Sequence, residues 1–304
     1  MEFQQGDFVV NQKVPDWGIG KILKTLGDKY RIFFENAGEK LISSKASLNK
    51  VELEEIHPVL NYINADTDLA KFRKPKDLER NFLELFPEGF QDPEYLDGER
   101  DYKVAASEFA NEALSPEKIS ALLKQKNYET VSNLGKKVVS KTNLIFRNEI
   151  ISLSAELSEN SGNQKIFSEA LFYHLYSKDS LKERFLAFRK ALKELNAEKW
   201  TIATYFLHLI YPDSCPFMKP MVTQKAAEAF GYPLDYTSNI QWDTYSRLID
   251  FANFIKRKIS SHHLLKPRDM IDIQGFMWCA DPSKYTKKDR LDLKRKRKKR
   301  LENK

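Results

Sequence analysis

The hydrophobic pattern of this 304-residue chain changes near residue 55, and that change most restricts the folds open to it. Before it, short apolar runs such as residues 8–10 and 30–34 alternate with turn residues such as Gly27-Asp28, which is typical of a small curled antiparallel sheet. After it, apolar residues recur with a period near 3.6, which indicates helices. The sequence therefore predicts an α+β chain, mainly α, in which a small N-terminal β-barrel precedes a helical body.

Helix-start signals and turn-forming residues divide the chain further. Ser115-Pro116-Glu117 is the clearest helix start, because serine can cap, proline suits the first turn and glutamate complements the helix dipole. Residues 87–101, rich in Gly, Pro, Asp and Glu, predict a link before that helix. We expect a barrel at 1–55, a helical linker region at 56–114, a helical domain at 115–283 and a tail at 284–304. Within the helical domain, helices are predicted at 144–157, 166–176, 181–195, 200–210, 222–230 and 242–259.

The formal charge of +7 is concentrated at the C-terminus. Residues 287–304 contain eleven Lys and Arg against three acids, so they carry +8 and the other 286 residues about −1. So charged and apolar-poor a segment is expected to be disordered. It predicts an electrostatic arm for nucleic-acid phosphates, with Lys294, Arg295, Lys296 and Arg297 at its centre. A solubilising tail and a localisation signal are the alternatives.

Composition excludes several function classes. No run approaches the roughly 18 apolar residues of a membrane span, so no membrane partner is expected. The first residues, MEFQQGDFVV, lack the pattern of a secretion signal, and a cytoplasmic protein is expected. Two cysteines, Cys215 and Cys279, and five scattered histidines do not predict a zinc site or a disulfide framework. Neither a metal nor a cofactor is expected.

The N-terminal segment resembles a known family of small barrels. The sequences GDFVV at 6–10, WGIGKIL at 17–23 and IFFENAGEKLI at 32–42 follow the order of Tudor/SH3-like barrels that occur in repair helicases, in transcription-repair coupling factors and as a domain of unknown function. The resemblance implies a docking module for nucleic acid, RNA polymerase or a repair helicase. Residue by residue, Trp17, Phe33 and Phe34 are expected to form barrel core.

A second resemblance lies in the helical region. The segments WTIATYFL at 200–207, YPDSCPFMKP at 211–220 and AAEAFG at 226–231 look like the core of helix-hairpin-helix DNA glycosylases. The spacing from Trp200 places Lys219 where that superfamily has an aspartate. The sequence LNAEK at 195–199 replaces its glycine-containing hairpin, and Lys199 at the end of this segment is a candidate contact for nucleic acid.

A base-excising enzyme must extrude a base, hold it between apolar or aromatic side chains and stabilise the sugar as the glycosidic bond breaks. Lys219 is the candidate nucleophilic amine, and Asp213 and Asp272 are the candidate catalytic carboxylates, with Asp269 near by. The base pocket is expected to be aromatic, and its candidate residues are Trp200, Tyr205, Phe217, Trp242 and Trp278.

Each reactive residue also has a structural alternative. Lys219 can bind a phosphate or a helix end, and Asp213, after a proline, can form a turn. Asp269 can cap a helix that begins at Met270. Asp272 lies in an apolar stretch, where a carboxylate needs a partner, and Arg268 stands four residues before it.

The resemblances together imply a DNA-binding protein that flips and excises a base and leaves an abasic site. Because both the hairpin and the aspartate are altered, a modified base is the expected substrate, and bacterial enzymes that remove hypermodified bases from phage DNA are the relatives that fit, which implies antiviral defence. The alternative is a non-enzymatic adaptor that binds DNA and docks RNA polymerase or a helicase through residues 1–55.

Overall fold

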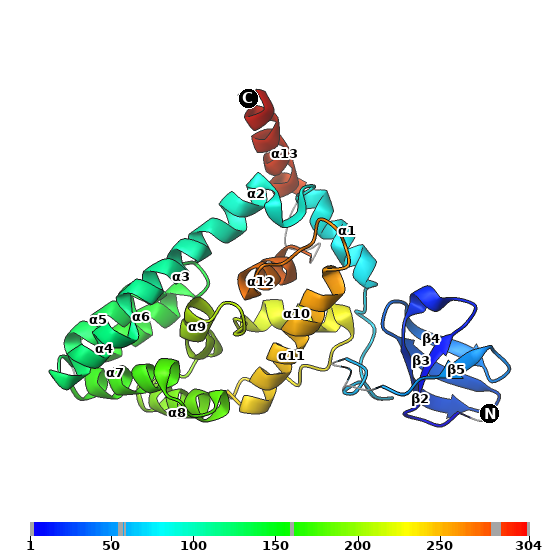
Figure 1. Ribbon diagram of the computed structural model, residues 1–304, viewed down its shortest axis with the longest axis horizontal. Helices are drawn as coiled ribbons and strands as arrows, with labels where there is room; N and C mark the ends of the chain where they lie inside the picture. The colour runs from blue at the N-terminus through cyan, green and yellow to red at the C-terminus, as the bar shows by residue number, and fades with distance from the viewer. Residues whose placement is uncertain (1–2, 54–56, 58, 159–160, 281–286, 303–304) are drawn as a thin grey trace.

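The computed structural model describes residues 3–53, 57, 59–158, 161–280 and 287–302. A five-stranded antiparallel sheet at the N-terminus is followed by a helical body (Figure 1). The predicted α+β, mainly α layout is therefore confirmed. None of the helices among these residues is long and apolar enough to cross a membrane.

The sheet contains five short strands in the order β4-β3-β2-β1-β5. Their bounds are β1 (Phe8–Asn11), β2 (Gly20–Leu26), β3 (Lys29–Phe34), β4 (Gly38–Ser43) and β5 (Leu48–Lys50), with a short 3₁₀ turn, η1 (Pro15–Trp17), after β1. The register of β2 against β3 shifts between Ile22 and Lys24, and such an irregularity bends a sheet. Phe34 lies in a small core of the sheet, and the partly buried Trp17 packs edge-on against it, with ring centroids 5.2 Å apart.

The six helices predicted between residues 144 and 259 are all present, with ends within five residues of those predicted. The described residues form thirteen α-helices. They are α1 (Pro75–Leu85), α2 (Pro93–Tyr95), α3 (Asp101–Ala113), α4 (Pro116–Lys124), α5 (Tyr128–Val139), α6 (Arg147–Glu156), α7 (Ser161–Tyr176), α8 (Leu181–Glu194), α9 (Trp200–Ile210), α10 (Pro220–Phe230), α11 (Trp242–Ile259), α12 (Met270–Cys279) and α13 (Lys287–Glu302). Between α1 and α3 the chain forms the 3₁₀ turn η2 (Gly89–Gln91) and the π-helical turn η3 (Leu96–Arg100). Ser115 occupies the N-cap position of α4, as predicted, without a side-chain capping hydrogen bond.

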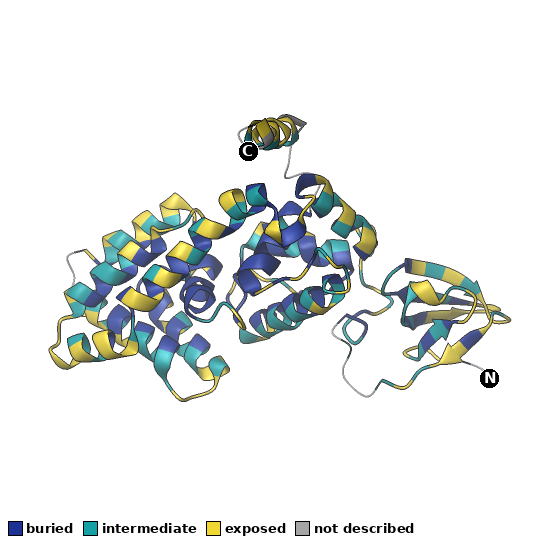
Figure 2. Ribbon diagram, turned by 45° about the horizontal axis from the view of Figure 1, so that its top comes forward, coloured by how far each residue is buried: buried dark blue, intermediate teal, exposed yellow. Residues whose placement is uncertain are grey.

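Helix α9 forms the centre of the body. All eleven of its residues are buried. Exposed residues follow the outward faces of the surrounding helices, whereas buried residues face inward (Figure 2). One core cluster contains residues from α1 to α12, so its packing does not separate 56–114 from 115–283; that boundary stays a prediction.

The sheet also packs against the body. Phe33, on the opposite face of β3 from Phe34, belongs to the large helical core. Gly231 ends α10 in the left-handed conformation, with φ of 65°, and a Cβ atom there would lie 3.0 Å from the ring of Phe33. The carboxylate of Glu35 binds Lys258 of α11 at 2.9 Å and His57 at 3.4 Å. Packing and charge thus connect the sheet to the body.

The C-terminal segment differs from its prediction. Residues 287–302 form the helix α13, where the sequence predicts a disordered tail. Lys, Arg, Leu and Glu are all good helix formers, and two arginines of this helix find acidic partners in and beside α2. Arg300 lies 3.0 Å from Glu94, and Arg297 lies 3.3 Å from Asp92. Those ion pairs supply a tertiary contact that composition alone does not reveal.

Candidate functional site

A cavity of about 450 Å³ opens where α6, α9 and α10 begin. Such a volume lies within the range of small-molecule sites. Trp278, near the end of α12, supplies a further part of the wall. The residues that line it are Phe146, Glu149, Glu198, Lys199, Trp200, Thr201, Lys219, Pro220, Met221, Val222, Tyr236, Ser238 and Trp278.

Lys219 lies at the N-cap of α10, where Pro220 takes the first helical position. Its Nζ atom is 5.3 Å from the ring centroid of Phe146 and 5.5 Å from that of Trp278. Aromatic rings at such distances attract an ammonium group. The amine is therefore held among the aromatic side chains of the cavity.

The cavity lining combines three helix N-termini with two lysines and two glutamates. Phe146, Lys199 and Lys219 occupy the N-cap positions of α6, α9 and α10, and none of these side chains carries a hydrogen-bond acceptor. Helix N-termini carry partial positive charge, and the two lysines add full charges. Because Glu149 and Glu198 offset the two lysine charges, the helix N-termini are the part of the wall that suits an anionic group.

Two carboxylates in the cavity were not anticipated from the sequence. Glu149 Oε2 accepts hydrogen bonds from the Thr201 hydroxyl at 2.8 Å and from the Phe146 amide at 3.3 Å. Glu198 Oε1 accepts one from Arg189 at 2.7 Å. In the sequence, Glu149 has the signature of an ordinary first-turn acid, and it is 70 residues from Lys219. Only tertiary folding brings them to one cavity.

Of the five predicted aromatic residues, the structure brings Trp200 and Trp278 to the cavity. The indole N–H of Trp200 donates to the Thr237 carbonyl at 2.8 Å, which fixes the ring. Tyr205 is fully buried and five residues farther along α9, so at about 100° per residue it points to another side of the helix. Its hydroxyl contacts Thr142 at 2.9 Å instead.

The other two aromatic residues form packing contacts away from the cavity lining. Phe217, 2% exposed, packs edge-on against Tyr205, with ring centroids 6.1 Å apart. Trp242 packs edge-on against Phe185 at 5.9 Å and Tyr245 at 6.1 Å. Phe217 lies in the segment between α9 and α10 and Trp242 begins α11, and both side chains pack against the core of the helical body.

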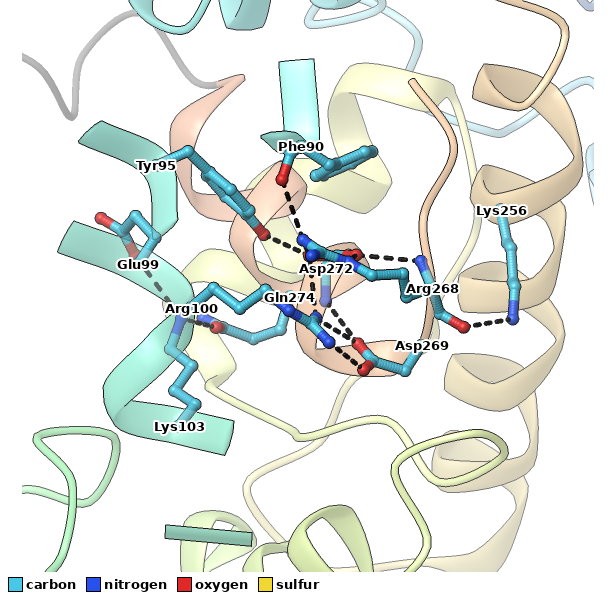
Figure 3. Close-up of polar contacts among 10 residues, drawn as sticks. All are labelled: Phe90, Tyr95, Glu99, Arg100, Lys103, Lys256, Arg268, Asp269, Asp272 and Gln274. Atoms are coloured by element: carbon cyan, nitrogen blue, oxygen red, sulfur yellow. Dashed lines mark hydrogen bonds and ion pairs between the residues drawn. The ribbon is translucent and has the colours of Figure 1, made fainter. Parts of the chain in front are cut away.

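Asp272 is fully buried in a network of ion pairs at the start of α12 (Figure 3). It accepts hydrogen bonds from Arg268 Nε at 2.8 Å and from the Tyr95 hydroxyl at 2.9 Å, and it forms an ion pair with Arg100 at 2.9 Å. The predicted pair with Arg268 is confirmed. With its oxygens so occupied, Asp272 stabilises the fold and does not line the cavity.

Asp269 caps α12, as expected, because its side chain accepts from the Asp272 amide at 3.0 Å. It also receives two hydrogen bonds from Arg100, at 2.8 and 2.6 Å. Burial alone would raise the pKa of Asp269, but the bonds to Arg100 and the amide outweigh it and lower that pKa. Asp213 is exposed in the loop between α9 and α10 and does not line the cavity. None of the three aspartates thus belongs to the cavity lining.

Lys103 extends the network from α3. Its side chain is fully buried and donates to Gln274 Oε1 at 2.6 Å, with Glu99 at 3.5 Å (Figure 3). Burial lowers the pKa of Lys103, and the charge of Lys219 lowers it further. The network as a whole balances three cations against three carboxylates, which makes its burial tolerable. It anchors α12, and with it Trp278, to α3.

The predicted nucleic-acid contacts fall in two places. Lys199 lies in the cavity wall. The other four belong to α13, where Arg297 is paired with Asp92, Lys296 lies 3.8 Å from Asp97 and Arg295 lies 3.5 Å from Asp292. Part of the positive charge on α13 is thus directed at the protein itself. Over the described residues, no group of three or more His, Cys, Asp or Glu side chains is placed to hold a metal ion.

Comparison with known proteins identifies the N-terminal region alone. Residues 3–54 match a family described as a protein of unknown function, DUF3553. An N-terminal domain of unknown function is therefore confirmed. No curated protein is significantly similar to the chain. No solved structure is significantly similar to it either.

Proposed function

We propose that the protein is a DNA glycosylase that flips a base into the cavity and excises it, with Lys219 as the catalytic amine. The observation that supports this proposal is the position of Lys219 Nζ, 5.3 and 5.5 Å from two aromatic rings in a cavity of about 450 Å³. Glycosylases hold an extruded base by stacking it against such side chains. The positive helix N-termini suit the phosphates that flank the flipped nucleotide.

The proposed reaction has two steps. The neutral amine of Lys219 attacks C1′ of the deoxyribose, and the C1′–N bond breaks with its electron pair on the departing base, which takes up a proton. The amine nitrogen loses a proton as the sugar ring opens to a Schiff base. Water then adds to the Schiff base, frees the lysine and leaves an abasic site, so the net reaction is hydrolysis.

Glu149 replaces Asp213 and Asp272 as the carboxylate of this proposal. Its hydrogen-bond partners, Thr201 and the Phe146 amide, are neutral, and its carboxylate belongs to the same cavity lining as Lys219. Glu198, in contrast, is paired with Arg189. We assign Glu149 the role of accepting the proton that the Lys219 ammonium must lose before it attacks.

A modified base is the proposed substrate, and defence against phage DNA the proposed setting. The cavity volume leaves room for a base that carries a substituent, and Phe146 and Met221 at its edge are 56% and 64% exposed, so the site is open to a large ligand.

The test is incubation of the purified protein with duplexes that contain unmodified, damaged or hypermodified bases, followed by mass spectrometry of released bases. Borohydride added during turnover should trap a covalent adduct between protein and DNA. Lys219→Arg keeps the charge without the nucleophile and should abolish both the adduct and base release, while DNA binding persists. Lys199→Arg, in the same cavity, is the matched control and should retain both. Wild-type excision by Lys219→Arg would refute the assignment of Lys219.

A second candidate, a non-enzymatic DNA-binding adaptor, is favoured by the surface of the sheet. Leu26 of β2 is 43% exposed and Leu41 of β4 is 57% exposed, so the sheet has two large apolar side chains that a docked partner would cover. RNA polymerase or a repair helicase is the proposed partner. If no base is released from any duplex although DNA binds tightly, the adaptor becomes the better proposal.

A further inference from the structure

We propose that a basic groove on α5, formed by Lys136, Lys137 and Lys141, binds the phosphate backbone of the DNA strand whose base enters the cavity. This inference rests on the proposed function. The groove is open, with a volume of about 640 Å³. Its lining residues are Phe109, Asn133, Lys136, Lys137, Ser140 and Lys141.

The composition of the groove favours a polyanion. Three of its six lining residues are lysines and none is a carboxylate. Lys136 and Lys137 lie in the last turn of α5, where they also complement the helix dipole. Lys141 lies beyond the end of the helix, and its Nζ is held 4.0 Å from the ring centroid of Phe109. A helix-end role therefore does not account for all three charges.

The groove and the cavity are joined by one short segment of chain. Residues 141–146 lead from the last lysine of the groove to Phe146 in the cavity wall. Five residues of extended chain span at most about 18 Å between the Cα atoms of Lys141 and Phe146. Because each DNA strand carries a phosphate about every 3.4 Å along the helix axis, this limit corresponds to about five phosphates.

The connecting segment is held in place by two tyrosines. The Tyr205 hydroxyl is 2.9 Å from Thr142 Oγ1 and donates to the Val138 carbonyl at 3.2 Å. The Tyr102 hydroxyl donates to Asn143 Oδ1 at 3.1 Å. Fixed at these points, the segment keeps the groove at a set distance from the cavity, so a strand bound at the lysines is positioned for base extrusion at Lys219.

The test compares two full-length variants that each lose three charges. K136Q/K137Q/K141Q removes the lysines of the groove, and K118Q/K124Q/K190Q removes three exposed lysines elsewhere on the body. Affinity for a duplex is measured at several salt concentrations, with circular dichroism as the check of folding. The slope of log affinity against log salt should shrink by roughly two to three. If the affinity at 1 M salt is unchanged, the groove variant should then bind about a hundredfold to a thousandfold more weakly near 0.1 M salt. The control variant should stay near the wild type.

The outcomes separate this inference from the proposed function. Equal affinities and slopes for the two variants would overturn the inference while the wild type still binds and excises. If the wild type fails to bind DNA, both proposals fall. In a third outcome, the wild type binds DNA without releasing a base, while the groove variant shows the smaller slope of log affinity against log salt. That result would support the groove and contradict the glycosylase.

Discussion

Asp272 is fully buried between Arg100 and Arg268, and the ion pairs with these two arginines compensate its negative charge. Removal of its charge would leave two buried or half-buried guanidinium groups short of a partner. Asp272→Asn should therefore lower the free energy of unfolding by about 3 to 5 kcal/mol, the usual loss when one member of a buried ion pair is removed. Chemical denaturation of the variant and the wild type measures this difference in the free energy of unfolding.

Asp213→Asn is the control for that change, since Asp213 is exposed and surface substitutions usually change stability by less than about 0.5 kcal/mol. A stable Asp272→Asn protein that has lost base excision would contradict the structural role assigned to Asp272.

The contacts of this ion-pair network that lie within residues 268–272 were predicted from the sequence. The pair of Arg268 and Asp272 follows from i to i+4 spacing, and the cap by Asp269 follows from its place before Met270. Arg100 and Lys103 could not be predicted, because they are about 170 residues away in the chain and reach α12 only through the packing of α3.

The α13 helix contacts the body at α2 and at the end of α1, and its acidic partners Asp92 and Glu94 have side chains that are 1% and 2% exposed. Glu94→Gln keeps the volume of the side chain but removes the charge that Arg297 and Arg300 approach. We expect α13 to separate from α2 more often, and trypsin to cleave within residues 287–302 severalfold faster. Timed digestion followed by mass spectrometry of the fragments measures this.

Glu302→Gln provides a comparison within the same helix, because Glu302 is exposed and pairs only with Lys298, at 3.7 Å, among the contacts described. Its digestion rate should match the wild type. Equal rates for all three proteins would mean that the contact between α13 and Glu94 does not restrain the helix.

Helix positions were predicted well where the 3.6-residue period was unbroken. The bounds of α9 and α11 match the predicted 200–210 and 242–259. The prediction of disorder fails for residues 287–302, which form α13. Composition indicates that such a segment has little apolar surface to pack, but it does not reveal the acidic partners in and beside α2. The link predicted at 87–101 folds into η2, α2 and η3, whose short, irregular turns have no simple period.

At the scale of the whole molecule, Glu35 forms an ion pair between the sheet and α11 of the body. Burial would raise the pKa of this carboxyl, but the hydrogen bond from His57 and the charge of Lys258 lower it to about 2, from 4.5. A depressed pKa stabilises the folded state above pH 4.5, and that stabilisation, about 3 kcal/mol, is lost as the pH falls from 4.5 towards 2.

Glu35→Gln should therefore be less stable than the wild type near pH 6, and the difference should shrink as the pH falls through this window. Urea denaturation at a series of pH values measures it. A difference that is constant with pH would show that the Glu35 charge contributes nothing to the contact.

The cavity itself shows the limit of prediction from sequence at this scale. Lys219, Trp200 and Trp278 became candidates through the resemblance to helix-hairpin-helix glycosylases. Phe146 and Glu149 come from the start of α6, where nothing in the sequence marks them as neighbours of Lys219. Convergence of three helix starts is a property of the packed body. It requires the tertiary arrangement, which periodicity does not supply.

The α10 helix has one end in the cavity and the other against the sheet. It begins after Lys219 and ends at Gly231, whose backbone faces the Phe33 ring. Eleven helical residues span about 16 Å and resist compression, so α10 acts as a rigid strut between the two. A displacement of the sheet along this axis is therefore expected to displace the Lys219 backbone at the other end of the helix.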